Sequence, residues 1–411
     1  MNKNLFYTAL VFLAFFPIIV TAQSMPVNNN VFAKHSFVRT VYNVISNYNG
    51  LDSFYQKLYR LKTTQTGTVS IVHIGDSHIQ PDFLSAVVRS GLQDFFGNAG
   101  RGLVFPYQLA QSNAPDDISS SSNVQWQYNR AAHPEIDLPY GISGFGIMTN
   151  SPNVTINMSL KDDPKRDFSF NRLKFFLDEN ENNSWKLDVN NNNKEFYLVK
   201  NENEDSVIYQ QVDIEQPTTS FSLSSLASSN AKKFYGVCLE NAEPGIIYHT
   251  IGVNGARYDH YNIASLFWKQ LPALKADLYI ISLGTNEAQA AKFNEAAFIE
   301  QLSLFIKKLK QISPGAGIII TTAPDSYKKK RYNTVLRSLN TAITNYCNKN
   351  SIPLWDLYRI TNGYGSAYSW AKRGLMNKDR IHFTADGYRL QGSLLLNALA
   401  KGYNNYQHTI E

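Results

Sequence analysis

The 411-residue chain has only two cysteines, Cys238 and Cys347, and they lie far apart in the sequence. A disulfide scaffold needs several paired cysteines, and a zinc knuckle needs cysteines a few residues apart, so neither can stabilise this fold. With 43% hydrophobic and 18% charged residues, the chain instead has enough apolar side chains to form an ordinary buried core.

A strong excess of one charge is also missing. The 39 Lys and Arg residues outnumber the 33 Asp and Glu residues, which gives a formal net charge of +6. This excess is far below that of the dense basic stripes typical of nucleic-acid-binding proteins, so we expect no nucleic-acid partner. A mildly basic protein suits an anionic polymer of the cell envelope, but the charge does not identify one.

Only one long hydrophobic run is present, at the N-terminus. Lys3 precedes the almost uninterrupted apolar residues 5–20, and Val20-Thr21-Ala22 has the small-residue pattern that signal peptidase accepts. An uncleaved membrane anchor is the alternative, but the run is interrupted by Pro17 and is shorter than the roughly 20 residues that span a bilayer. We therefore expect residues 1–22 to be a cleaved signal peptide, and the mature protein to be periplasmic or secreted without stable membrane insertion.

Short apolar runs alternate with helical patterns in two parts of the chain. Residues 69–74 form a β-branched run, and apolar residues at helical spacing follow over 82–96. The alternation resumes downstream and predicts four more strands and three helices, namely strands at 245–251, 278–283, 317–322 and 352–357, and helices at 298–309, at 332–347 and from near residue 384. Two short helices are also expected between residues 31 and 61. This order favours a parallel sheet in an α/β sandwich.

The pattern changes between residues 106 and 234, where apolar residues recur at every second position. The clearest case is residues 154–160, and polar turns such as the asparagine-rich residues 190–193 separate these segments. Strands in series without helices pair antiparallel, and about 130 residues suit a two-sheet sandwich. We therefore expect an α/β domain made of residues 23–105 and 235–411, with an all-β sandwich domain inserted at 106–234. Four of its aromatic residues are expected mainly in its core, with stacking on sugars as the alternative: Trp126, Tyr128, Phe175 and Trp185.

Ser77 lies in the sequence Gly75-Asp76-Ser77-His78, at the predicted turn from a strand to a helix. The carboxyl end of a parallel strand opens onto the crevice in which α/β proteins bind ligands. The N-terminus of the following helix also points backbone N–H groups toward developing negative charge. A serine in such a turn can equally act only as a helix cap, so this tetrapeptide alone does not identify a nucleophile.

Asp379 and His382 lie three residues apart before the last predicted helix, where one loop can hold both. A serine needs a base to become a nucleophile, and a histidine base needs a carboxylate that orients its ring. Asn286 follows a predicted strand, and its amide can donate to an oxyanion. Gly255 lies in a turn where a glycine can bring a backbone N–H close to a substrate. Taken singly, each segment is explained as well by an ordinary turn.

The order of these four segments resembles the four-block pattern of the SGNH, or GDSL-like, hydrolases. In that superfamily a serine follows the first strand, a glycine the second and Gly-x-Asn the third, and Asp-x-x-His precedes the last helix. The resemblance covers residues 65–105 and 235–411 and implies a flavodoxin-like α/β/α sandwich with a parallel sheet. It implies Ser77 as nucleophile, His382 as base and Asp379 as its orienting carboxylate. The oxyanion hole would consist of the Ser77 and Gly255 N–H groups and the Asn286 side chain, with Gly252 as the alternative to Gly255.

One departure from the common pattern points to a branch of this superfamily. Leucine commonly follows the nucleophilic serine, whereas His78 follows Ser77 here. Four stretches resemble peptidoglycan O-acetylesterases, which also carry an inserted β-sandwich similar to a carbohydrate-binding module; they are HIGDSHIQPDFL, GNAGRGLVFPY, YHTIGVNGARYDHY and DRIHFTADGY. The resemblance implies an exported serine esterase, without metal or other cofactor, that removes O-acetyl groups from an acetylated glycan, above all peptidoglycan. We further expect a monomer.

Other functions fit parts of the sequence. Another acetylated polysaccharide such as xylan could be the substrate, a second sugar could replace water as acetyl acceptor, or an inactive fold could only bind glycan. Gly-Asp-x-His also opens the metallophosphoesterase motif, and His73, Asp76 and His78 lie close in sequence. That family needs two further metal-binding blocks that this chain lacks. Because all the residue types of a serine hydrolase are present, we favour the esterase.

Overall fold

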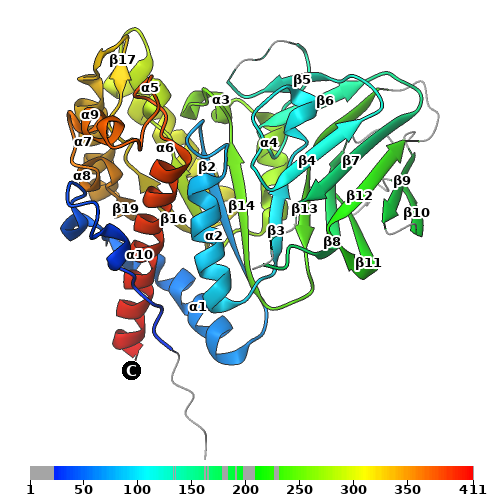
Figure 1. Cartoon of the computed structure of the whole chain (residues 1–411), viewed down its shortest axis with the longest axis horizontal. Helices are drawn as coiled ribbons and strands as arrows, with labels where there is room; N and C mark the ends of the chain where they lie inside the picture. The colour runs from blue at the N-terminus through cyan, green and yellow to red at the C-terminus, as the bar shows by residue number, and fades with distance from the viewer. Residues whose placement is uncertain are drawn as a thin grey trace, which may run out of the picture.

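The computed structural model describes residues 23–132, 134, 136–161, 163, 166–177, 184–189, 192–197, 209–225 and 231–410. The expected signal peptide lies outside these residues, as do Asn190 and Asn191 of the expected turn. The described chain forms a layered α/β half beside a β-sandwich (Figure 1). No described helix combines the length and apolar character that a membrane crossing requires.

The α/β half is built on a six-stranded sheet with the order β1-β19-β16-β15-β2-β14. Its five parallel strands lie where the sequence predicts them: β2 (Thr68–Gly75), β14 (Gly245–Gly252), β15 (Leu278–Ser282), β16 (Gly317–Thr321) and β19 (Leu354–Trp355). The short β1 (Ile45–Ser46) pairs antiparallel at one edge. Counted along the chain, the parallel strands have the flavodoxin-like order 2-1-3-4-5, so the winding direction changes between β2 and β15. Ligands bind at such a switch point in open α/β sheets.

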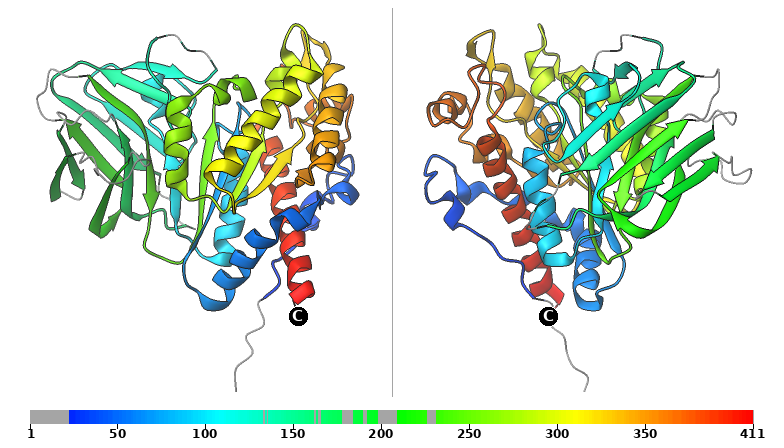
Figure 2. Two further views of the ribbon diagram at one scale, coloured as in Figure 1. Left: turned by 180° about the vertical axis from the view of Figure 1, so that it is seen from behind. Right: turned by 45° about the vertical axis from the view of Figure 1, so that its right-hand side comes forward.

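Helices cover both faces of this sheet, because parallel strands are apolar on both sides. One face packs against α1 (Asp52–Thr64), α2 (Phe83–Phe96) and α10 (Ala385–Ile410). The other packs against α3 (Tyr258–Asn262), α4 (Ser265–Gln270), α6 (Glu295–Ile312) and α7 (Val335–Lys349). The short helices α5 (Thr285–Gln289), α8 (Leu357–Ile360) and α9 (Ser366–Lys372) complete this half. Figure 2 shows the layers from behind and from one side.

The first of the two helices expected between residues 31 and 61 is replaced by short turns. The chain forms η1 (Asn30–Phe32), η2 (Thr40–Tyr42), β1 and η3 (Tyr48–Leu51), and only α1 matches a predicted helix. Val41 and Val44 are exposed, so the apolar residues do not share one buried face. Asn43 stabilises the irregular backbone, because its buried amide accepts from Trp355 Nε1 and donates to the Leu394 carbonyl, both at 2.9 Å. A helix would not place that side chain between both partners.

The expected antiparallel sandwich is present as two sheets, with the orders β10-β9-β12-β7-β4 and β11-β8-β13-β6-β5, and with β3 also paired to β13. Its strands are β3 (Gly100–Val104), β4 (Ile118–Ser122), β5 (Gln127–Arg130), β6 (Phe145–Thr149), β7 (Val154–Leu160), β8 (Phe170–Leu177), β9 (Ser184–Val189), β10 (Asn192–Tyr197), β11 (Gln210–Thr218), β12 (Ser220–Ser225) and β13 (Lys232–Glu240). A 3-10 turn, η4 (Tyr107–Ala110), follows β3.

The antiparallel sheets extend beyond the limits expected for the insert. β3 pairs with the end of β13, with Val104 opposite Val237 and Gly102 opposite Leu239. The sequence places both segments in the α/β domain instead. The glycine-rich β3 shows no alternation of apolar and polar residues, so only its distant partner strand reveals that it belongs to the sandwich.

Three of the four aromatic residues singled out in the insert are core residues. Trp126, Phe175 and Trp185 are buried, and Tyr128 is half-buried against the same apolar cluster. The expectation that the four lie mainly in the core is therefore confirmed.

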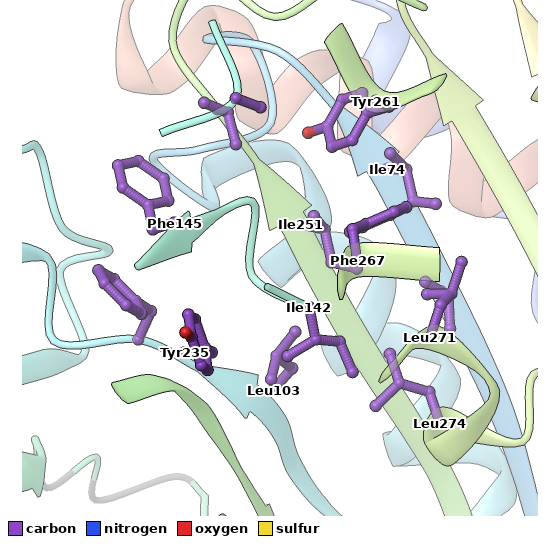
Figure 3. Packing of buried hydrophobic residues seen from close by; sticks show 14 of the residues in the cluster. Ile74, Leu103, Ile142, Phe145, Tyr235, Ile251, Tyr261, Phe267, Leu271 and Leu274 are labelled. Atoms are coloured by element: carbon purple, nitrogen blue, oxygen red, sulfur yellow. The ribbon is translucent and has the colours of Figure 1, made fainter. Parts of the chain in front are cut away.

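One apolar cluster joins the insert to the α/β half (Figure 3). Ile74 of β2 and Ile251 of β14 belong to it together with Leu103, Ile142 and Phe145 from the insert side. Polar contacts cross the same boundary, because the N–H of Leu103 donates to His249 Nδ1 at 3.1 Å and that of Ile142 to Gln270 Oε1 at 2.8 Å. The sandwich is thus packed onto the edge of the parallel sheet rather than tethered to it.

Candidate active site

Ser77 lies in the turn after β2, at the carboxyl edge of the parallel sheet and at the switch point between β2 and β15. The turn is tight, because Ile79 and Gln80 both donate a backbone N–H to the Asp76 carbonyl at 3.1 Å. Gly75 leaves the necessary space, since a Cβ there would lie 2.4 Å from Ile79 Cγ1. Ser77 is partly exposed, so a substrate can approach its hydroxyl.

Three side chains from two distant parts of the chain are linked by hydrogen bonds in one series. Ser77 Oγ lies 2.9 Å from His382 Nε2, and His382 Nδ1 lies 2.7 Å from Asp379 Oδ2. The Asp379 carboxylate favours a proton on Nδ1, which leaves Nε2 free to accept from the serine hydroxyl. The side chains of His382 and Asp379 are 39% and 44% exposed, so the series opens to solvent.

Asp379 is held in its charged form. Its Oδ1 accepts the backbone N–H groups of Ile381 at 2.9 Å and His382 at 3.1 Å, in addition to the ring contact at Oδ2. Partial burial alone would raise the pKa of this carboxyl, but the hydrogen bonds from His382 and Ile381 outweigh it and hold the pKa below its usual value. A carboxylate that stays ionised can stabilise a protonated histidine.

His78 connects the Ser77 turn to the loop of His382. Its Nδ1 lies 3.0 Å from Asp76 Oδ1, and its Nε2 lies 3.2 Å from the Ile381 carbonyl oxygen. Burial alone would lower the pKa of His78, but the charge of Asp76 and these two acceptors raise it above its usual value. Through these two contacts, the residue that departs from the common pattern joins the Ser77 turn to the His382 loop.

The two glycines that the sequence leaves as alternatives have different surroundings. At Gly252 a Cβ would lie 2.2 Å from the backbone nitrogen of Gln80, so this glycine allows β14 to pack against the Ser77 turn. Gly255 instead has a φ of +84°, which side-chain-bearing residues rarely adopt. Its N–H and that of Ser77 have no acceptor among the described residues. Both N–H groups are therefore available to a ligand.

Gln80 is a site residue that the sequence does not reveal. Its side-chain oxygen accepts the backbone N–H of Asn254 at 2.7 Å, and its amide nitrogen donates to Ser112 Oγ and the Asn113 carbonyl at 2.9 Å each. The buried Gln80 thereby joins the Ser77 turn, the Gly255 turn and the start of the insert. Gln80 lies in the stretch HIGDSHIQPDFL, three residues after Ser77, but the residues of that stretch give it no role by themselves.

Asn286 and Glu287 lie in the first turn of α5, the helix after β15. Asn286 Nδ2 donates to the Ala256 carbonyl at 3.0 Å and to Asp76 Oδ2 at 3.2 Å, so its amide lies between the serine and glycine turns. Glu287 Oε1 accepts the N–H of Tyr258 at 2.9 Å, while Oε2 is buried without a hydrogen-bond partner among the described residues. Burial raises the pKa of Glu287 to about 7.

The three residues on which the metallophosphoesterase alternative depends, His73, Asp76 and His78, do not come together at one site. His73 Nδ1 lies 2.8 Å from Tyr248 Oη and its Nε2 lies 2.8 Å from Ser282 Oγ, so both ring nitrogens are used inside the sheet. His78 and Asp76 pair with each other instead. Within the described residues, no three His, Cys, Asp or Glu side chains are grouped to hold a metal ion.

Residues 225–390 match the GDSL-like lipase/acylhydrolase family, a span that includes all the predicted site residues except Ser77. A solved structure described as "Peptidoglycan O-acetylesterase in action" has a TM-score of 0.74 and 22% identity, and the match covers 88% of this chain and 99% of that one. A lipase/acylhydrolase from Enterococcus faecalis has a TM-score of 0.30 and 20% identity over 38% of this chain and 77% of its own. A search of curated proteins found no match.

The family match and the fold agree on which segments form the candidate site. The matched span contains the glycine, asparagine and Asp-x-x-His blocks, and the fold places the Ser77 turn against all three. The long structural match also includes the region of the inserted sandwich, because it covers 88% of this chain. This chain therefore has the SGNH hydrolase fold, and residues 225–390 match the GDSL-like lipase/acylhydrolase family.

Proposed function

We propose that this protein is an exported serine esterase that removes O-acetyl groups from peptidoglycan through an acetyl-Ser77 intermediate. The observation that carries the proposal is the series from Ser77 Oγ to His382 to Asp379, at 2.9 and 2.7 Å, located at the switch point of the sheet. The fold shared with a structure described as a peptidoglycan O-acetylesterase supports the choice of an acetylated glycan.

The first half of the reaction transfers the acetyl group to the protein. Ser77 Oγ attacks the acetyl carbonyl carbon while His382 Nε2 takes the hydroxyl proton. The tetrahedral intermediate then collapses, the bond between that carbon and the sugar oxygen breaks, and His382 returns the proton to the leaving oxygen. The ionised Asp379 stabilises the imidazolium in between.

The negative charge on the carbonyl oxygen is stabilised by donors from three turns. The unpartnered N–H groups of Ser77 and Gly255 supply two, and the Asn286 amide supplies the third by exchanging its 3.2 Å contact with Asp76 for the oxyanion. In the second half, water attacks the acetyl-enzyme with the same base and the same donors, and acetate leaves. If a sugar hydroxyl took the place of water, the same site would be a transferase.

Release of acetate by the purified protein and by Ser77→Ala tests this function. The substrates are p-nitrophenyl acetate, O-acetylated peptidoglycan and acetylated xylan. We expect release from peptidoglycan that disappears in Ser77→Ala, because triad residues act as a unit. Faster release of acetate from xylan than from peptidoglycan would support the serine mechanism but contradict peptidoglycan as the substrate. No release from any of the three would overturn the esterase in favour of a glycan-binding protein.

Export is the remaining part of the proposal. It depends on residues 1–22, whose sequence has the features of a signal peptide. Fractionation of cells that express the gene, followed by N-terminal sequencing, should find the protein outside the cytoplasm with Gln23 as its first residue. An intact Met1 terminus in the membrane fraction would instead indicate an anchor.

A further inference from the structure

Four tyrosines, three of them exposed, cluster next to the His382 loop, and we call them the tyrosine platform. Tyr327 and Tyr332 come from the hairpin of β17 (Tyr327–Lys328) and β18 (Arg331–Tyr332). Tyr364 lies just before α9, and Tyr368 lies within it. Tyr332, Tyr364 and Tyr368 are 43%, 43% and 46% exposed, while Tyr327 is buried beneath them. The hairpin stands at the upper end of the molecule in Figure 1, close to α5 and α9.

The rings of the platform hold one another in place. The ring centroids of Tyr327 and Tyr332 are 4.9 Å apart, and those of Tyr332 and Tyr364 are 5.5 Å apart. The Arg380 guanidinium lies 4.6 Å from the Tyr327 centroid and 5.3 Å from that of Tyr368. Single exposed aromatics are ordinary on protein surfaces, but a packed group of partly exposed aromatic rings is typical of a binding surface. Tyrosines held in this way lose little conformational entropy on binding.

Hydrogen bonds connect the tyrosine platform to the loop of His382 and to the helix that contains Asn286. The N–H of Tyr327 donates to the Arg380 carbonyl at 2.8 Å, and Arg380 lies between Asp379 and His382 in the sequence. From the other side, Gln289 Nε2 donates to the Tyr327 carbonyl at 2.8 Å, and Gln289 is the last residue of α5, the short helix that contains Asn286. A polymer held at Ser77 would therefore extend over these tyrosines on one side.

Cations surround the same surface. Lys329, Lys330 and Arg331 are exposed at the tip of the hairpin, and the Arg337 guanidinium lies 5.1 Å from the Tyr364 centroid. Ring faces pack against the apolar C–H faces of sugar rings, and clustered cations attract carboxylates. The combination suits a chain of sugars that carries negative charge, as peptidoglycan does through its peptide carboxylates.

We propose that the tyrosine platform is a subsite that binds the sugar rings of an anionic glycan strand beside the scissile acetyl group. This inference rests on the proposed function for the identity of the polymer. It assigns glycan binding to exposed rings of the α/β half, since the aromatic residues Trp126, Phe175 and Trp185 of the insert are buried.

The test uses the catalytically inert Ser77→Ala protein, so that binding is measured without hydrolysis. Co-sedimentation with insoluble, de-O-acetylated peptidoglycan is measured for three proteins. They are Ser77→Ala alone, Ser77→Ala combined with the pair Tyr332→Ala and Tyr364→Ala, and Ser77→Ala combined with Tyr48→Ala. Tyr48 is the matched control, because it is 44% exposed but lies in η3, away from the platform. We expect the pair to weaken binding about tenfold or more and Tyr48→Ala to leave it unchanged.

Two further measurements sharpen the result. In the active protein, the pair should lower kcat/KM on O-acetylated peptidoglycan at least about tenfold more than on p-nitrophenyl acetate, and Tyr332→Phe with Tyr364→Phe should restore it. Equal binding of peptidoglycan by the pair variant and by the Tyr48→Ala control would contradict glycan binding by the tyrosine platform. Tyrosine-dependent binding that is equally strong on neutral xylan would overturn its preference for anionic glycans. The protein could release no acetate and still bind peptidoglycan in a way that Tyr332→Ala weakens. That result would contradict the proposed esterase activity and support the glycan-binding subsite.

Discussion

Asn286 lies where the serine, glycine and asparagine turns meet, with its amide between Asp76 and Ala256. A preorganised donor at that position is expected to stabilise the oxyanion and to contribute little to binding of the ground state. Asn286→Ala should lower kcat on p-nitrophenyl acetate by about 100- to 1,000-fold with a small change in KM. Asn350→Ala removes an exposed amide at the end of α7 and serves as the control. A loss of tenfold or less for Asn286→Ala would remove this residue from the oxyanion hole.

Gln80 acts through Asn254 on the neighbouring Gly255, so we infer that it is a positioning residue. Gln80→Ala should lower kcat by about 10- to 100-fold, because a misplaced N–H stabilises the oxyanion poorly. Gln80→Glu keeps an oxygen for the Asn254 N–H and loses the donors to the insert. Steady-state kinetics should show that Glu restores most of kcat. If Ala and Glu reduce kcat equally, the contact with the insert matters and the positioning of Gly255 does not.

At the level of elements, the end of β14 packs against the Ser77 turn only because residue 252 is glycine. Its Cβ would overlap backbone atoms of Gln80, which cannot move aside as a side chain can. Gly252→Ala should therefore lower the free energy of unfolding by roughly 1–3 kcal/mol or more, as overpacking does. Gly315→Ala is the matched control, since its Cβ would have nothing within 4 Å. Chemical denaturation measures both, and equal stability of the two variants would contradict the argument.

Glu287 links α5 to the first residue of α3 and titrates near neutral pH. Its pKa is raised by burial from 4.5 to about 7, so its contribution to stability is fully present below pH 4.5 and is lost as the pH rises through about 7. The wild-type unfolding temperature should fall between pH 5 and 8 more steeply than that of Glu287→Gln, which cannot ionise. Glu295→Gln, an exposed change, should follow the wild type. Parallel curves for all three proteins would show that Glu287 ionises normally.

At the level of the whole molecule, the insert and the parallel sheet share one apolar cluster and should unfold together. Ile142→Ala removes a fully buried side chain at their junction and should cost about 2–5 kcal/mol. Hydrogen exchange should then show the same loss of protection in β8 of the insert and in β15 of the parallel sheet. A loss confined to the insert would mean that the sandwich folds as a separate domain.

Local patterns were sufficient to locate most elements. Period-two alternation marked β7, and apolar runs marked all five parallel strands, because strand and helix periodicity follows from backbone geometry alone. The same reasoning failed for η1 and η2, where the Asn43 side chain replaces backbone hydrogen bonds, and for Tyr332, which was expected in a helix but belongs to β18. Asn43 contacts distant segments, whereas Tyr332 pairs with Tyr327 in a short hairpin that the helical pattern does not show.

The amino-acid sequence is enough to establish which residue types are present, their order along the chain and the alternation of strands and helices in the α/β half. These depend on neighbours a few positions apart. Which of these residues meet depends on the packing of distant elements: Ser77 Oγ and His382 Nε2 belong to residues 305 positions apart in sequence and lie 2.9 Å apart. The same packing places Gln80 against Asn254, buries Trp126, Phe175 and Trp185 of the insert, and leaves exposed tyrosines beside the His382 loop. Such contacts depend on how whole elements pack, and no local pattern carries that information.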